Sequence, residues 1–115
     1  MNTRFVGALK EDIAISYLEE NGFEIIERNF KCKIGEIDVI AKKDNVIRFI
    51  EIKFRTGNIA GGVHYAISNQ KLIKISKIAN FYIMTHPSGN ISYSIDAILI
   101  DDDKIEYLEN IFGGM

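Results

Sequence analysis

The sequence has little of three residues that often direct an interpretation: one cysteine, one proline and no tryptophan among 115 residues. Because Cys32 is alone, neither an internal disulfide nor a zinc cluster built from cysteines can form. With so little proline, no low-complexity run and no internal repeat, we expect no linker and a single domain over residues 1–115. Apolar residues make up 47% of the chain, which is enough for one buried core.

Long apolar runs are also missing. The longest are about as long as a strand, far short of the ~20 residues of a membrane span. Residues 1–14 carry charges where a signal peptide needs an apolar block, so we expect a cytoplasmic protein without a membrane partner. The formal net charge of −2 lacks the basic balance of a dedicated nucleic-acid binder, but it leaves room for a basic patch beside an acidic metal site.

Hydrophobic periodicity predicts two helices and five strands. The first helix is expected over residues 3–21 and the second over residues 68–85, with Gly22 at the end of the first. Their predicted inner stripes are Phe5, Val6, Leu9, Ile13, Ala14, Tyr17 and Leu18, and Leu72, Ile75, Ala79 and Tyr82. The strands are expected at residues 23–33, 35–43, 46–56, 93–100 and 104–112. The order α-β-β-β-α-β-β predicts an α/β domain with a central mixed β-sheet flanked by helices.

A two-residue turn at Asp44-Asn45 would join the second and third strands as a hairpin and fix their register. Lys43 would then pair with Val46. The further pairs would be Val39 with Ile50 and Ile37 with Ile52 on one face, and Ile40 with Phe49, Asp38 with Glu51 and Glu36 with Lys53 on the other. A slip by one residue would turn the charged side chains against the isoleucines, which argues against a three-residue turn.

Directly opposed carboxylates at Asp38 and Glu51 would repel each other, since their Cβ atoms would be about 4.5–5.5 Å apart. Either one of the two must be protonated or a cation must bridge them, and oxygen ligands suit Mg²⁺. The alternative is a solvated sheet face on which lysine and glutamate pair across strands.

Other charged residues could extend such a site. Glu11, at the edge of the first helix's apolar face, is either a third carboxylate or a surface acid favoured by the helix dipole. Lys71, Lys74 and Lys77, with Gln70 beside them, are either phosphate contacts or the solvated back of the second helix. Arg55 follows Lys53 on the same strand face.

A separate acid, Asp96, interrupts an otherwise apolar strand, as a buried and hydrogen-bonded aspartate could do.

Asp38 followed by Glu51-Ile52-Lys53 on the next strand resembles the D…(D/E)-x-K core of the restriction-endonuclease-like superfamily. The whole chain more specifically resembles the YraN family of small bacterial proteins, related to Holliday-junction resolvases. The residues that carry this resemblance are Gly7, Glu11, Ala14, Arg28-Asn29, Gly35-Glu36-Ile37-Asp38, Glu51-Ile52-Lys53, Arg55, Lys71, Ile95-Asp96 and Asn110-Ile111-Phe112. One departure is Lys10, which stands where the family usually has a second glycine before the helical acid.

The resemblance implies a catalytic set of Asp38, Glu51, Lys53 and Glu11. Asp38 and Glu51, with the backbone carbonyl of Ile52, would hold Mg²⁺, for which Mn²⁺ could substitute. Lys53 would orient the attacking water or offset charge in the transition state. Arg55, Gln70, Lys71 and Lys74 are the predicted nucleic-acid contacts.

The leading hypothesis is therefore a Mg²⁺-dependent endonuclease that hydrolyses DNA phosphodiesters, with branched or flapped DNA as candidate substrates. The alternative is a non-catalytic module that keeps the nuclease fold and binds nucleic acid or protein. A purely structural domain would require the opposed carboxylates to be accidental. The sequence leaves a homodimer open.

Overall fold

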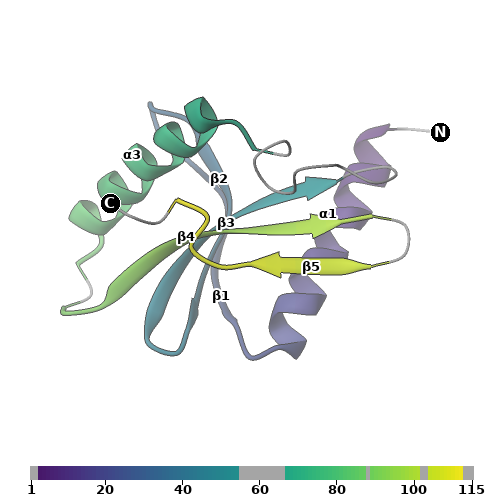
Figure 1. Ribbon diagram of the computed structural model, residues 1–115, viewed down its shortest axis with the longest axis horizontal. Helices are drawn as coiled ribbons and strands as arrows, with labels where there is room; N and C mark the ends of the chain where they lie inside the picture. Colours follow the sequence, from purple (N-terminus) through teal and green to yellow (C-terminus); the bar gives the residue numbers. More distant parts are fainter. Residues whose placement is uncertain (1–2, 55–66, 88, 102–103, 113–115) are drawn as a thin grey trace.

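The computed structural model describes residues 3–54, 67–87, 89–101 and 104–112, the first eight of them by their backbone only (Figure 1). The elements are, in chain order, α1 (Thr3–Glu20), β1 (Glu24–Lys31), β2 (Glu36–Lys43), β3 (Val46–Phe54), α3 (Asn69–Thr85), β4 (Ser92–Ile100) and β5 (Ile105–Leu108). The expected element order and the α/β class are confirmed. None of the helices within these residues is long and apolar enough to cross a membrane.

The five strands form one sheet in the order β1-β2-β3-β4-β5. The sheet is mixed, because β3 and β4 run parallel while the other neighbouring strands are antiparallel. Parallel neighbours need a crossover connection, and α3 lies within the connection from β3 to β4. The two helices pack on opposite faces of the sheet (Figure 1), so alternate residues of the strands belong to different core clusters.

The stripe predicted for α3 is buried in full. On α1, Ala14 and Leu18 are completely buried against the sheet, but Ile13 is 49% exposed, so its assignment to the core was wrong. Ala14 and Leu18 lie four residues apart on one helical row, and Ile13 is about 100° around the helix from Ala14. The side chains of residues 5, 6 and 9 lie outside the described part of the chain.

The β2–β3 hairpin has the predicted turn. Asp44 and Asn45 both have positive φ, 56° and 60°, which defines the type I′ turn that suits a two-residue hairpin. The ladder runs from Lys43–Val46 to Val39–Ile50, in the predicted register.

Beyond Val39 the predicted alternation fails. Ile37 packs in the cluster on the α3 side, whereas Val39, Ile50 and Ile52 pack in the cluster on the α1 side, so the expected pairing of Ile37 with Ile52 is wrong. Asn29, with φ of 54°, interrupts β1 between the residues that pair with Val39 and Ile37. The β2–β3 ladder thus ends beside Asp38, whereas β1 and β2 keep one register from Arg28–Val39 to Lys31–Glu36.

The same break affects the other predicted pair. The β2–β3 ladder ends before Glu36 and Lys53 can pair. Glu36 is instead the partner of Lys31 on β1, and Lys53 is the partner of Leu99 on β4.

Candidate functional site

Glu51 lies on the α3-facing side of β3, two residues after the buried Phe49, and it meets Lys71 from the first turn of α3. The Lys71 Nζ atom is 3.7 Å from Glu51 Oε1, and the Glu51 side chain is only 14% exposed. Ser68 is the N-cap of α3, and its hydroxyl accepts a 3.2 Å hydrogen bond from the Lys71 backbone N–H. The cap therefore fixes the helical turn that presents Lys71 to the sheet.

Asp38 lies where the β2–β3 ladder has ended. Its Oδ2 atom accepts a 2.8 Å hydrogen bond from the backbone N–H of Ile52. Burial raises the pKa of Asp38 above its ordinary value, while the hydrogen bond from Ile52 opposes that rise. The nearby charges of Glu11 and Glu36 raise it further, and the Lys71 ammonium lowers it.

Glu51 is the more strongly perturbed of the two acids. Burial, and then the charge of Asp38, raise the pKa of Glu51 to about 7, while Lys71 opposes the rise. The nearby Asp38 carboxyl group thus favours the protonated form of Glu51. The two acids thus lie close together, although the ladder ends at Val39–Ile50, before the cross-strand pair that the hairpin register predicted for them. Their surroundings call for a proton or a cation.

Glu11, on α1, is half-buried and near enough for its charge to act on Asp38. Among the residues that the structure describes, however, no three His, Cys, Asp or Glu side chains form a group that could hold a metal ion. The donor set is therefore a pair of carboxylates. That chemistry fits Mg²⁺, which usually takes one or two carboxylates from a protein and completes its shell with water and phosphate oxygens.

The predicted nucleic-acid contacts, together with Lys53, divide into three groups. Lys71 faces the acids, so it does not belong to a solvated back of the helix. Gln70, Lys74 and Lys53 are exposed, and Lys53 is on β3 two residues beyond Glu51. Arg55 lies outside the described residues. Lys53 is thus beside the acid pair by position, while its catalytic role stays a prediction, as does that of the Ile52 carbonyl.

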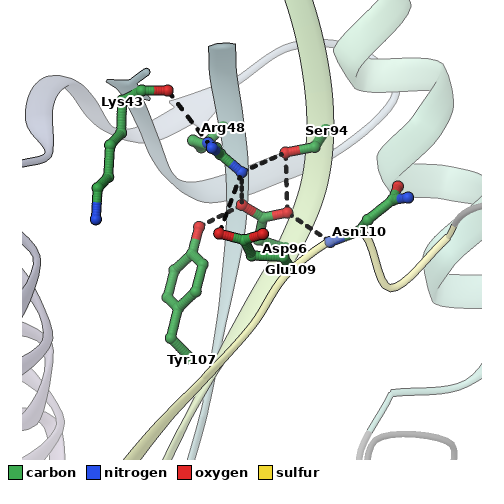
Figure 2. A network of polar contacts seen from close by, with 7 residues as sticks. All are labelled: Lys43, Arg48, Ser94, Asp96, Tyr107, Glu109 and Asn110. Atoms are coloured by element: carbon green, nitrogen blue, oxygen red, sulfur yellow. Dashed lines mark hydrogen bonds and ion pairs between the residues drawn. The ribbon is translucent and has the colours of Figure 1, made fainter. Parts of the chain in front are cut away.

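A second polar cluster surrounds Asp96, which is fully buried, as its place in an apolar strand predicted (Figure 2). Its carboxylate accepts hydrogen bonds from Ser94 Oγ (2.9 Å), from the Asn110 backbone N–H (2.8 Å) and from the Tyr107 hydroxyl, and it pairs with Arg48 at 3.4 Å. Arg48 shares the α1-facing side of β3 with Ile50 and Ile52. The cluster therefore lies on the opposite face of the sheet from Glu51.

Sequence reasoning missed Arg48 and Tyr107 as the partners of Asp96. Arg48 is only 7% exposed and stands in an apolar strand. A buried cation normally needs an anion. The direct partner of Arg48 in the neighbouring parallel strand is Ser94, and Asp96 follows Ser94 by two residues. That signal becomes readable only when the pairing of β3 with β4 is known.

A mixed five-stranded sheet with a helix on each face, and an acid pair where β2 meets β3, defines an α/β protein compatible with a nuclease-like fold. The model of a family described as "Uncharacterised protein family UPF0102" matches residues 10–100. The chain belongs to this family, and the resemblance to the YraN family is thereby confirmed.

Proteins named "UPF0102 protein" from three bacteria illustrate the similarity. That of Aliarcobacter butzleri is 48% identical over 91% of this chain and 94% of its own length. That of Helicobacter hepaticus is 44% identical over 96% of this chain and 97% of its own length. That of Neisseria meningitidis is 36% identical over 93% of this chain and 94% of its own length. The similarity therefore extends over almost the entire chain.

Proposed function

We propose that this protein is a Mg²⁺-dependent endonuclease that hydrolyses phosphodiester bonds in DNA. The observation that carries the proposal is the meeting of Asp38 and Glu51, two largely buried acids with raised pKa values, at the end of the β2–β3 ladder. A folded protein that buries two acids together bears a cost in stability, and such costs concentrate at functional sites. Because a single cysteine is typical of a reducing compartment, we assign this activity to the cytoplasm.

Asp38 and Glu51 would hold the ion, with the Ile52 carbonyl as a further ligand. A bound Mg²⁺ supplies charge stabilisation and a more acidic water. The residues of the chain perform the remaining tasks. The Ile52 N–H keeps the Asp38 carboxylate in place, since it donates to one of its oxygens at 2.8 Å.

Lys53 would orient the attacking water, or stabilise the negative charge that builds on the phosphate, because it stands on the same side of β3 as Glu51. Lys71 compensates Glu51 in the free protein, with its ammonium 3.7 Å from Oε1. With Glu51 as a metal ligand, Lys71 would be available to contact a phosphate oxygen. Glu11 is not among the proposed ligands, but its negative charge near Asp38 favours binding of a cation there.

A cleavage assay tests the proposal. Purified protein is incubated with linear, flapped and four-way DNA in Mg²⁺ or Mn²⁺, alongside Asp38→Asn prepared by the same route. Cleavage by the wild type alone supports the proposal. Equal cleavage by both proteins assigns the activity to a contaminant, and no cleavage of any DNA with either metal contradicts the proposal.

One observation favours a second candidate, a non-catalytic module that keeps the fold and binds nucleic acid or protein. Lys71 already compensates Glu51, and the described residues contain no group of three ligands for a metal. A module of this kind would bind DNA equally well in EDTA and in Mg²⁺, and Asp38→Asn would leave that binding unchanged.

A further inference from the structure

A pocket of about 590 Å³ lies between the turn that joins β1 to β2 and the C-terminal half of α3, away from the acid pair. Its volume is in the range of ordinary ligand sites, roughly 300–1,000 Å³. Its apolar walls come from Phe30 on β1, Ile34 in the turn and Phe81 on α3, and Lys31 and Lys33 also line it. None of the described residues that line it is acidic.

The apolar walls are open to solvent. Phe81 is 41% exposed and Ile34 is 37% exposed. The ring centroids of Phe30 and Phe81 are 6.5 Å apart, with an angle of 35° between the ring planes. An exposed aromatic ring with lysines beside it is the arrangement that binds single-stranded nucleic acid, since bases stack on the ring and lysines meet the backbone.

Lysines also connect this pocket with the acid pair. A Cβ atom added at Gly35 would lie 2.8 Å from Lys74 Cε and 3.5 Å from its Nζ, so the Lys74 side chain extends across the β1–β2 turn. Lys74 follows Lys71 by one helical turn, and Lys71 contacts Glu51. The one carboxylate of the turn segment 31–36 is Glu36, which is the cross-strand partner of Lys31.

We propose that this pocket binds an unpaired base of the DNA strand whose phosphate lies at the acid pair, with the base against Phe81 and the backbone along Lys33 and Lys74. The assignment to DNA rests on the proposed function. Lys71 and Phe81 are ten residues apart on α3, or roughly 15 Å at 1.5 Å per residue. The bound base is therefore a few nucleotides from the phosphate at the acids. The protein would therefore prefer DNA with a single-stranded segment on one side of the cut.

The test measures binding of a short fluorescent single-stranded DNA and of a duplex, both in EDTA so that cleavage cannot interfere. The variants are Phe81→Ala and Ile34→Ser. The matched control is Ile73→Ala, because Ile73 is on the same helix, is 46% exposed and does not line the pocket. Thermal unfolding of each protein shows that it is folded.

We expect Phe81→Ala to weaken single-strand binding about 5-fold to 100-fold, the effect of losing one stacked base, and to leave duplex binding unchanged. Ile34→Ser should weaken it in the same direction, and Ile73→Ala should not change it. Replacing single nucleotides by abasic ones should weaken wild-type binding at one position of the strand. The same replacement should have no effect in Phe81→Ala, because the two changes remove one contact.

Equal single-strand affinity of the wild type and both pocket variants would overturn the proposal. Tighter binding of RNA than of DNA of the same sequence would overturn the assignment to DNA. Loss of self-association in Phe81→Ala, without a change in DNA affinity, would make the pocket an interface between two copies instead. If the wild type cleaves DNA in Mg²⁺ but Phe81→Ala binds single-stranded DNA as tightly as the wild type, only the pocket proposal is refuted. If binding depends on Phe81 but the wild type cleaves no DNA, only the nuclease proposal is refuted.

Discussion

The backbone N–H of Ile52 donates a 2.8 Å hydrogen bond to the carboxylate of Asp38, so a peptide group of β3 holds a side chain of β2. The bond forms one step beyond Val39–Ile50, the last pair of the β2–β3 ladder. An N–H group at that point still needs an acceptor, and the carboxylate provides it. Asp38 is thereby fixed beside Glu51, and this arrangement is the basis of the first three predictions.

Asp38→Asn should abolish stabilisation of the protein by divalent metal. Mg²⁺ or Mn²⁺ at about 100 times its dissociation constant should stabilise the wild type by about 2.7 kcal/mol, since a ligand of the native state alone raises the free energy of unfolding. Asparagine keeps an oxygen for the Ile52 N–H but loses the charge. Melting temperature with and without metal measures the effect. Asp12→Asn is the control, because Asp12 is exposed and pairs with Arg28 at the surface; an equal metal shift in all three proteins would place the metal elsewhere.

Glu51→Gln should flatten the pH dependence of stability. The pKa of Glu51 is about 7 in the folded protein against an ordinary value of 4.5, so the folded state holds the proton more tightly than the unfolded chain. The contribution of Glu51 to stability is therefore complete below about pH 4.5 and is lost as the pH rises through 7. After allowance for screening by solvent, the loss should be about 1–2 kcal/mol.

Urea unfolding between pH 4.5 and 8 measures this difference. Exposed Glu19 provides the control Glu19→Gln, which should keep the wild-type slope. Parallel pH profiles for the wild type and Glu51→Gln would show that the pKa of Glu51 is ordinary.

Lys53→Ala should reduce cleavage at least ~100-fold and leave the fold and metal binding intact. The charge of Lys53 is expected to act on the phosphate as negative charge builds in the transition state, an effect that typically reaches 10²–10³ in rate. Because Lys53 is exposed, the change in stability should stay within about 0.5 kcal/mol. The readouts are single-turnover cleavage and the metal-induced shift in melting temperature. Lys77→Ala, exposed on α3, is the control, and equal cleavage by both variants would remove Lys53 from the site.

The cluster around Asp96 should matter for stability only. Asp96→Asn removes the buried anion of Arg48 and leaves it only the exposed carboxylate of Glu109, 3.8 Å away, so it should cost about 3–5 kcal/mol of unfolding free energy. Tyr107→Phe removes one hydrogen bond and should cost about 1–2 kcal/mol. Urea unfolding measures both. Because the cluster lies on the opposite face of the sheet from Glu51, the folded variants should keep the wild-type cleavage rate; a specific loss of rate would connect the two faces.

The sequence predicted the acid pair because the information is local. Asp44 and Asn45 tolerate positive φ, and a two-residue turn fixes the register as far as Val39–Ile50, which leaves Asp38 and Glu51 each one residue beyond the last pair. The reversal of Ile37 could not be found in this way. It occurs opposite Asn29, a residue with positive φ in a different strand, and a pattern of alternation within β2 carries no information about β1.

The partners of the buried charges were also beyond the sequence. Lys71 meets Glu51 only when α3 packs on β3, and Arg48 meets Asp96 only when β4 pairs with β3. Spacing along the chain carries no signal for contacts of this kind. Ser68 as the cap of α3 was within reach, since a serine before an apolar helical pattern is a frequent start of a helix.

Asp38 and Glu51 belong to a single hairpin, whereas Lys71 belongs to α3, in the crossover between β3 and β4. The pairing of β3 with β4 joins residues far apart in the sequence, such as Arg48 and Ser94, which are 46 residues apart. Contacts close in sequence form sooner than distant ones during folding. The hairpin should therefore bring Asp38 and Glu51 together before Lys71 arrives, and their repulsion should slow refolding at neutral pH. In stopped-flow refolding at pH 8, Asp38→Asn should be faster than the wild type. The difference should shrink at pH 5, because Glu51, whose pKa is about 7 in the folded protein, then holds a proton and the repulsion falls. A rate difference independent of pH would contradict this order of events. Mg²⁺ present during refolding should speed the wild type alone, so the ion expected in the finished site would also act on the route by which the chain reaches it.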